Sequence, residues 1–472
     1  MAKERLAAAA FAAGLSLLGL GLAVSCSSDS DDPAPDARPA FRNPPEVTSA
    51  DGVLATTLEA KATTHEIGGR RFTTWLYNGL YTPPVLRVKP GDVIELRLVN
   101  GTTEHTNLHY HGLNVSPRGN SDNIFVQVDP GEHFDYRIEI SPEHPTGLFW
   151  YHPHAHGNTE FQTFNGMSGG LIVDGLLDPF PPELQGIEER ILLLKDIQQA
   201  ASGEGVPDDI DSNAPTQRTV NGLVNPTMTI RPGETQLWRV ANVGPDIYYR
   251  LSLDRHVLHE IVRDGNRHTE VVSRDEIVLP PSSRVEFLVQ GGPPGEYAFR
   301  TLEFDTGPQG DQYPEVTLAT LVSGGTAETP AVLPTALPPV PDLRNAEISR
   351  RRRFVFSEND DGTTFFINGR GFDPDRTDTT VRLGDVEEWE IVNDSEELHV
   401  FHIHQLDFQV VESEGAPVPF TGYQDTVNLP FGASVKILIP FTNPVIVGRF
   451  VYHCHIMAHE DNGMMAVIEV AP

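Results

Sequence analysis

Residues 452–464 read YHCHIMAHEDNGM, a run rich in side chains that bind soft metal ions. Cys454 stands between two histidines, and His459 and Met464 follow at intervals of five residues. In an extended segment alternate side chains point to opposite faces, so Cys454 faces one way and its two histidine neighbours face the other. Metals bound on the two faces would be joined through a few covalent bonds, which suits electron transfer better than a structural role.

Copper is the metal that this combination of donors favours. A thiolate, imidazoles and a distant thioether form the ligand set of blue-copper sites, in which soft sulfur and borderline nitrogen select copper. Zinc is the main alternative, but structural zinc sites usually contain a C-x2-4-C pair, and the two cysteines of this chain are Cys26 and Cys454. A buried free cysteine among surface histidines is the alternative without metal chemistry.

The stretch closes the third copy of a unit that recurs along the chain. Each copy has an Asn-Gly pair, then a Gly-acid pair that opens an alternating strand ending at Asn, and later a Pro-bearing turn with a second strand. The Asn-Gly pairs are residues 78–79, 221–222 and 368–369, and the Gly-acid pairs are residues 91–92, 233–234 and 384–385. The strands that follow the Gly-acid pairs end at Asn100, Asn242 and Asn393. The later turns, together with their strands, are residues 130–140, 280–290 and 430–440. The spacing from the glycine to the strand-ending asparagine is nine in every copy. Short alternating strands with frequent turns predict β-sandwiches or barrels.

We therefore predict an all-β protein of three consecutive Greek-key domains. The expected domains are residues 46–178, 186–325 and 348–472, with a Pro-rich linker at 326–347. In the aligned repeats Pro153 occupies the place of Cys454, whereas the second unit reads YAFRTLEFD there and offers no metal ligand. The first and third domains are thus expected to bind metal, and the second to act as a spacer that sets their geometry.

Composition supports this interpretation and limits the function. The chain of 472 residues has 41 glycines, 39 prolines and 39% hydrophobic residues, which is typical of a loop-rich β protein. A formal charge of −32 argues against nucleic-acid binding, because phosphate recognition needs a basic surface. We interpret the charge as an acidic, solvated surface; a role in concentrating cationic substrates is the weaker alternative.

The N-terminus predicts export. Lys3 and Arg5 precede an apolar run at 6–24, and the sequence Ala23-Val24-Ser25-Cys26 resembles a lipoprotein signal that is cleaved before Cys26. Residues 1–26 are therefore expected to be a signal peptide and residues 27–45 a disordered tether, with an uncleaved membrane anchor as the alternative. The mature protein would lie in the periplasm or cell envelope, anchored by lipid on Cys26, and Cys454 would have no disulfide partner.

Histidines concentrate in four clusters, two in each of the metal-binding domains. The clusters are His109 with His111, His152 with His154, His399 with His402 and His404, and His453 with His455 and His459. Each His-x-His places two imidazoles on one face of an extended segment. One such pair is weak support for a metal site, but four in matching places of two repeats are strong support.

At these residues the chain resembles the multicopper oxidases, a family of laccase-like enzymes built from three cupredoxin-like domains. The resemblance rests on HYHG (109–112), WYHPHAHG (150–157), HVFHIH (399–404) and HCHIMAHEDNGMM (453–465), and it extends over nearly the whole mature chain. It implies four copper ions per chain. A two-domain copper nitrite reductase is disfavoured, because such chains lack the complete set of eight trinuclear histidines.

The resemblance also implies a ligand set. A type 1 copper would be bound by His399, Cys454, His459 and an axial Met464; a type 2 copper by His109 and His402; and a type 3 pair by His111, His152, His154, His404, His453 and His455. The trinuclear cluster of type 2 and type 3 copper would then lie between the first and third domains.

The implied reaction is laccase-like oxidation of small reductants by O2, which is reduced to water. Phenols, aromatic amines or metal ions would donate single electrons near exposed edges of His399 and His459. Oxygen reduction consumes protons, and Glu460 and Asp122 are the candidates that supply them. One chain completes every site, so a monomer is expected.

Two alternatives remain within the same family. A copper-tolerance protein that oxidises Cu(I) is disfavoured because the chain has only six methionines and they form no cluster. A non-catalytic copper-binding protein of the cell envelope is disfavoured because every expected ligand position is filled.

Overall fold

The computed structural model describes residues 38–203, 205–207 and 210–472. The expected signal peptide, Cys26 and residues 27–37 lie outside this part of the chain. Among the described residues, no helix has both the length and the apolar character needed to cross a membrane.

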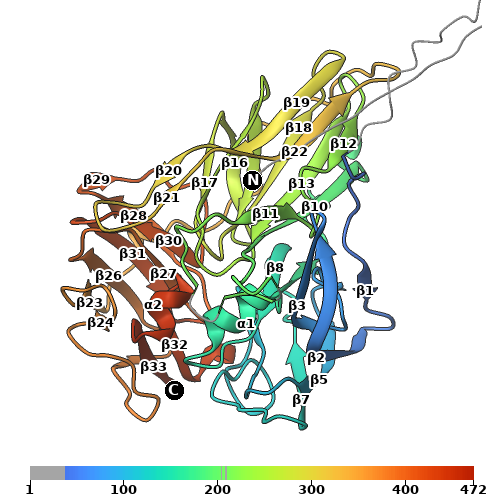
Figure 1. Ribbon diagram of the computed structural model, residues 1–472. Helices are drawn as coiled ribbons and strands as arrows, with labels where there is room; N and C mark the ends of the chain where they lie inside the picture. The colour runs from blue at the N-terminus through green and yellow to red at the C-terminus, as the bar shows by residue number, and fades with distance from the viewer. Residues whose placement is uncertain (1–37, 204, 208–209) are drawn as a thin grey trace, which may run out of the picture. The chain divides into compact units, whose positions relative to one another are not determined.

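The first part of the chain forms two sheets (Figure 1, blue to teal). Their strand orders are β3-β2-β5-β7 and β1-β4-β9-β8-β6. The elements are β1 (Glu46–Thr48), β2 (Val53–Ile67), β3 (Arg70–Tyr77), β4 (Val85–Val88), β5 (Val93–Gly101), β6 (His109–His111), β7 (His133–Glu139), β8 (Gly147–His152), α1 (Thr159–Asn165) and β9 (Gly169–Val173).

The middle part forms two larger sheets and a small hairpin. The strand orders are β11-β10-β13-β18-β15-β16 and β12-β22-β19-β14-β17, with β20 paired to β21. The elements are η1 (Pro182–Leu184), β10 (Glu188–Ile197), β11 (Gln217–Val220), β12 (Thr227–Ile230), β13 (Thr235–Asn242), β14 (Tyr249–Leu253), β15 (Leu258–Arg263), β16 (Asn266–Arg274), β17 (Ile277–Leu279), β18 (Arg284–Gln290), β19 (Gly295–Thr301), β20 (Phe304–Asp305), β21 (Gln312–Tyr313) and β22 (Val316–Ser323).

The two large sheets of the middle part recur strand for strand in the last part. Its sheets have the orders β24-β23-β26-β31-β28-β29 and β25-β33-β32-β27-β30. The elements are η2 (Leu343–Asn345), β23 (Arg350–Glu358), β24 (Phe365–Ile367), β25 (Thr379–Arg382), β26 (Val386–Asn393), β27 (His399–Ile403), β28 (Gln409–Ser413), β29 (Ala416–Pro417), β30 (Thr426–Leu429), β31 (Ser434–Pro440), η3 (Pro444–Ile446), β32 (Gly448–Cys454), α2 (Met457–Asp461) and β33 (Met465–Ala471). The all-β class and the repeated unit are confirmed, while the domain boundaries stay predictions.

The three Asn-Gly pairs form equivalent tight turns. The asparagines have φ of 54°, 54° and 55°, and the glycines that follow have φ of 72°, 77° and 69°. Two successive residues with positive φ make a type I′ turn, whose twist matches the strands on either side. The pairs therefore fix the same tight turn in each copy, closed by a single antiparallel bridge, and this is why the repeat is visible in the sequence.

The asparagine that ends the central strand of each copy also has one structural role. The side-chain Nδ2 of Asn100, Asn242 and Asn393 donates to two backbone carbonyls, one in the loop that follows and one further along the chain, at distances between 2.7 and 3.3 Å. In the last copy one acceptor is the carbonyl of Glu397, 2.7 Å away. The repeated asparagine thus holds in place the loop that leads to His399.

The expected tether is wrong in its last eight residues, 38–45. Phe41 N donates to the Thr227 carbonyl at 2.9 Å, and the side chain of Asn43 pairs with the main chain of Glu189 and Ile191 at 2.9 Å each. This segment therefore lies along the middle domain, whose strand edges satisfy its backbone groups. The predicted linker at 326–347 contains no strand, but Leu337 within it is buried and its N–H donates to the Thr269 carbonyl at 2.9 Å.

Lys195 joins the middle domain to the first. It is buried on β10, and its Nζ donates to the carbonyls of Tyr81, Gly166 and Ser168 at 2.8, 3.0 and 2.6 Å. Burial lowers the pKa of Lys195 from 10.5 to about 7. Between pH 7 and pH 10.5 the unfolded chain binds more protons than the folded protein, so the contribution of Lys195 to the free energy of unfolding rises with pH. This contribution is lost as the pH falls toward 7.

We expect Lys195→Met to remove that pH-dependent gain. It should also lower the free energy of unfolding by at least about 2 kcal/mol, because three buried carbonyls lose their donor. Urea unfolding at pH 7 and pH 9 measures both effects, with Lys89→Met, at an exposed position, as the matched control. An equal pH dependence in the wild type and Lys195→Met would contradict the prediction.

Candidate metal centres

The histidine clusters occupy equivalent strands of the first and last domains. In the first domain β6 pairs with β8 so that His109 lies opposite His152. In the last domain β27 pairs with β32 so that His402 lies opposite His453. The matching strands of the middle domain, β14 and β19, pair without a histidine or cysteine. All ten histidines of the four clusters are buried, as is Cys454.

Eight of these histidines gather in one place, where the first domain meets the last. His154, His404 and His453 form one group of three, with the Nε2 atoms of His154 and His404 at 3.4 and 3.1 Å from that of His453. The Nδ1 of His453 lies 2.9 Å from the Cys454 carbonyl. That hydrogen bond places the ring proton on Nδ1 and leaves the Nε2 lone pair facing the other two rings.

A second group of three contains His111, His152 and His455. His111 Nδ1 lies 3.1 Å from His455 Nε2, and the rings of His152 and His455 have centroids 5.4 Å apart. His152 Nδ1 is 2.8 Å from the Pro153 carbonyl, and its buried Nε2 has no protein partner. His111 and His152 also belong with His109 to a group whose candidate ligand atoms lie within 4.8 Å of one another.

The remaining two histidines, His109 and His402, lie between the groups. His109 stacks on His404 and His402 stacks on His111, each with ring centroids 3.9 Å apart. Their Nδ1 atoms are held from outside, His109 by Asp122 at 3.0 Å and His402 by the Asp425 carbonyl at 2.8 Å. The Nε2 atoms of His109 and His402 are buried without a protein partner.

These donors fit metal ions. Burial lowers the imidazole pKa of His152 to about 3 and that of His154 to about 4. It also lowers the pKa of five further ligand candidates, His109, His111, His402, His404 and His455. These imidazoles are therefore neutral. A buried nitrogen without a partner is unfavourable unless a cation or a hydrogen bond satisfies it. Neutral imidazoles that converge in this way are suited to copper.

A separate candidate site surrounds Cys454. Its Sγ lies 3.8 Å from His399 Nδ1 and 3.7 Å from His459 Nδ1, and it accepts the Val400 N–H at 3.4 Å. Burial raises the pKa of the thiol well above its usual range, so a bound metal ion is what would favour the thiolate here. Met464 is buried next to this site: its carbonyl accepts the Cys454 N–H at 3.0 Å, and its N–H donates to the His459 carbonyl at 2.9 Å.

Two residues that the sequence did not single out hold the rings of this site. Ser395 Oγ lies 3.0 Å from His399 Nε2, and Glu397 Oε1 lies 3.2 Å from His459 Nε2. Phe365 stacks on His459 with ring centroids 4.1 Å apart. Each nitrogen that faces Cys454 is therefore opposed by a polar contact on the other side of its ring, which fixes its orientation.

The expectation of two exposed histidine edges is wrong. His399 is 0% exposed and His459 is 7% exposed. The loop that carries Ser395 and Glu397 covers them, and the Leu398 N–H binds the Thr306 carbonyl next to β20 at 2.7 Å. A segment of the middle domain, distant in sequence, thus closes over the site and leaves only a small edge of His459 accessible.

Both candidate proton carriers lie against histidines of the cluster. The Glu460 oxygens are 3.4 Å from His154 Nδ1 and 3.2 Å from His453 Nδ1. Burial acts to raise the pKa of Glu460, but these two histidines outweigh it and lower the pKa to about 2. Asp122 accepts from Gln405 Nε2 at 2.7 Å as well as facing His109, and burial raises the pKa of Asp122 to about 8.

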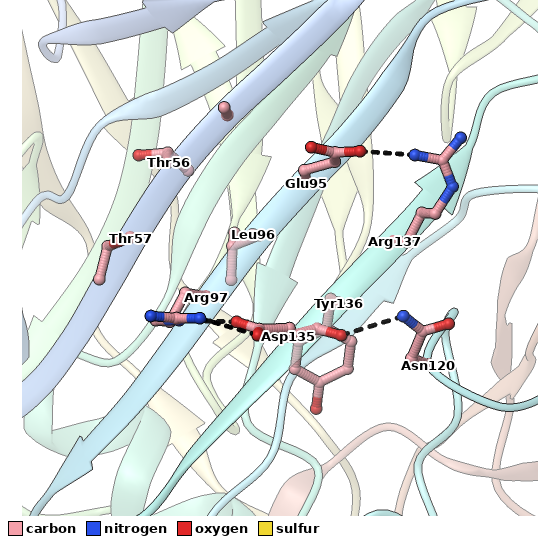
Figure 2. A pocket seen from close by; sticks show the side chains of 10 residues that line it. Thr56, Thr57, Glu95, Leu96, Arg97, Asn120, Asp135, Tyr136 and Arg137 are labelled. Atoms are coloured by element: carbon pink, nitrogen blue, oxygen red, sulfur yellow. Dashed lines mark hydrogen bonds and ion pairs between the residues drawn. The ribbon is translucent and has the colours of Figure 1, made fainter.

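The hollow in Figure 2 lies elsewhere, on strands β2, β5 and β7. It measures about 630 Å³, and the described residues that line it include no histidine or cysteine. Its charges are paired within the protein, Arg97 with Asp135 at 2.7 Å and Arg137 with Glu95 at 2.6 Å. We find no reason in its chemistry to treat it as the active site.

Family models described as multicopper oxidase match residues 59–177, 193–326 and 338–472. The chain is 29% identical over 441 residues to the multicopper oxidase mco of Staphylococcus haemolyticus, covering 90% of this chain and 91% of that protein. It is 27% identical to the cell division protein FtsP of Escherichia coli, covering 86% and 87%. The crystal structure of a laccase from Pediococcus acidilactici superposes with a TM-score of 0.80 at 28% identity, covering 93% of this chain and 95% of that one.

Proposed function

Because the chain belongs to the multicopper oxidase family, we propose that it acts as a laccase-like oxidase on phenols and aromatic amines. The observation that carries the proposal is the position of Cys454. It faces His399 and His459 in one site, while His453 lies in one histidine group of the cluster and His455 in the other. A single short segment therefore links a site for one-electron uptake to a site that can hold three metals.

We assign the sites as follows. His399, Cys454, His459 and the axial Met464 would hold type 1 copper, His109 and His402 type 2 copper, and the two groups of three the type 3 pair. Four coppers so bound would supply one-electron uptake from the donor and the reduction of O2 with four electrons and four protons to two waters. The distances and the partner-free nitrogens described above support this stoichiometry.

The protein itself would orient ligands and hold protons. Asp122 and Ser395 fix rings from outside the two sites, at His109 Nδ1 and His399 Nε2. Asp122 and Glu460 are buried carboxyl groups within reach of the cluster, as the proton demand of O2 reduction requires. We propose that Asp122 holds a proton beside His109 and that Glu460 passes protons beside His154 and His453.

Oxygen uptake by copper-loaded protein tests the function. With phenols and aromatic amines we expect one O2 consumed for every four electrons donated, without release of peroxide, and no uptake by copper-free protein. Turnover with Cu(I), Fe(II) or Mn(II) alone would favour a metallo-oxidase. Stable copper binding without O2 uptake for any donor would favour a non-catalytic copper protein. The similarity to the cell division protein FtsP is the reason to test this alternative.

We further propose that the protein is exported to the periplasm or cell envelope, is anchored through lipid on Cys26 and is a monomer. The sequence around Cys26, with its basic start and apolar run, supports export. The histidines and the cysteine of both sites come from this one chain, which supports the monomer.

A further inference from the structure

Arg284 connects the middle domain to the histidine cluster. It begins β18, its side chain is 0% exposed, and its Nη1 and Nη2 donate to the two carboxylate oxygens of Asp425 at 2.8 and 2.6 Å. Such a bidentate pair fixes the orientation of the carboxylate. The two residues lie 141 positions apart in the sequence.

Asp425, in turn, touches a histidine from each metal-binding domain. Its Oδ1 lies 3.4 Å from His111 Nε2, and its backbone carbonyl lies 2.8 Å from His402 Nδ1. These contacts place the ring proton on His111 Nε2 and on His402 Nδ1. The nitrogens left for metal are then His111 Nδ1, which faces His455, and His402 Nε2, which has no protein partner.

The surrounding residues leave room for this pair and little else. Gly112 follows His111 with φ of +86°, and a Cβ there would lie 2.3 Å from Arg284 Nη2 and 2.6 Å from Asp425 Oδ2. The guanidinium also lies over the Phe149 ring, 5.7 Å from its centroid. The glycine of the HYHG motif is therefore required by a side chain that arrives from another domain.

We propose that Arg284 is a positioning residue of the trinuclear cluster, which acts through Asp425 on His111 and His402. Asp425 is close enough to both histidines for the three to form a metal-binding group of their own. Because Arg284 engages both carboxylate oxygens, Asp425 stays a hydrogen-bond acceptor outside the cluster. The middle domain is thus more than a spacer, because it supplies the positive charge that holds Asp425, and through it His111 and His402, in position. The inference rests on the proposed function.

The test compares two buried arginines of the middle domain. In copper-loaded Arg284→Met we expect the blue type 1 absorption to remain, the electron paramagnetic resonance signal of type 2 copper to change or disappear, and affinity at that site to fall about 10- to 100-fold. Arg239→Met is the matched control. Arg239 is also buried and reaches the first domain, through Glu286, which accepts the Leu148 N–H at 2.8 Å, but it touches neither Asp425 nor a histidine of the cluster.

Four outcomes decide the question. Type 2 and type 3 signals that are unchanged in folded Arg284→Met, or changed equally in Arg239→Met, would overturn the proposal. If Arg284→Met does not fold, Arg284→Lys decides, because lysine keeps the charge but cannot engage both oxygens: an unchanged type 2 signal would again overturn it. Absence of every copper signal from the wild type would instead refute the proposed function.

Discussion

Replacement of Cys454 by serine is expected to abolish the blue absorption and to reduce oxidase activity to less than about one-thousandth, equivalent to about 4 kcal/mol on the barrier. The thiolate is the soft donor of the proposed type 1 site, and a hydroxyl is a poor substitute for it. The same residue joins that site to His453 and His455, so the substitution removes both the entry point and the link. We do not expect loss of the fold to cause the loss of activity, because serine and cysteine are similar in size.

Absorption and oxygen uptake, measured on one copper-loaded preparation, check this prediction. The type 2 signal should persist in Cys454→Ser, because the ligands of that site are unchanged. Met465→Leu serves as the matched control, since it removes a buried sulfur from the neighbouring strand, where Met465 packs with Ile124, Val451 and Val467. Activity retained by Cys454→Ser would refute the proposed electron route.

Glu460→Gln is expected to slow oxygen reduction about 100-fold, the usual contribution of a positioned proton-transfer group. The carboxylate oxygens lie 3.4 and 3.2 Å from His154 and His453, and both are buried without a hydrogen-bond partner of good geometry. Glutamine keeps the size of the side chain but cannot exchange a proton. Electron uptake should be unaffected, because the Glu460 carboxylate faces His154 and His453 rather than Cys454, His399 or His459.

Two rates separate these steps. Anaerobic bleaching of the blue absorption by a phenol should be unchanged in Glu460→Gln, while reoxidation by O2 becomes slow and its pH profile changes. Asp461→Asn is the matched control: it lies on the same helix, α2, and its carboxylate accepts the N–H groups of Gly157 and Glu160 at 2.7 and 2.9 Å. Equal slowing in both variants would contradict a specific role for Glu460.

Much of the fold could be read from local patterns. The Asn-Gly pairs predict tight turns because two successive residues with positive φ are rare outside such turns. The strand after the Gly-acid pair alternates in the first and last copies because one of its faces is buried, whereas every residue of β13 in the middle copy is buried. The histidine clusters were equally visible, since His-x-His puts two rings on one face of a strand. The structure brings all eight expected histidines of the cluster together.

The partners of those histidines could not be read in the same way. Asp425 lies 314 positions from His111. Ser395 and Glu397, which contact the histidines of the Cys454 site, belong to a loop without a distinctive motif. Nothing in the periodicity of a strand distinguishes an arginine that faces solvent from one, such as Arg284, that is buried against another domain. The glycine of HYHG was the one local signal that something approaches closely at that point.

The amino-acid sequence by itself determined the three repeated β units, the metal-binding pattern of the first and third, and the place of Cys454 between two ligand candidates. These features depend on spacing along the chain, and strand geometry converts spacing directly into direction. Only the tertiary structure decided that His399 is buried, that residues 38–45 lie along the middle domain, and that Arg284 reaches the cluster. Burial and charge pairing depend on which surfaces meet, and that is a property of the whole fold.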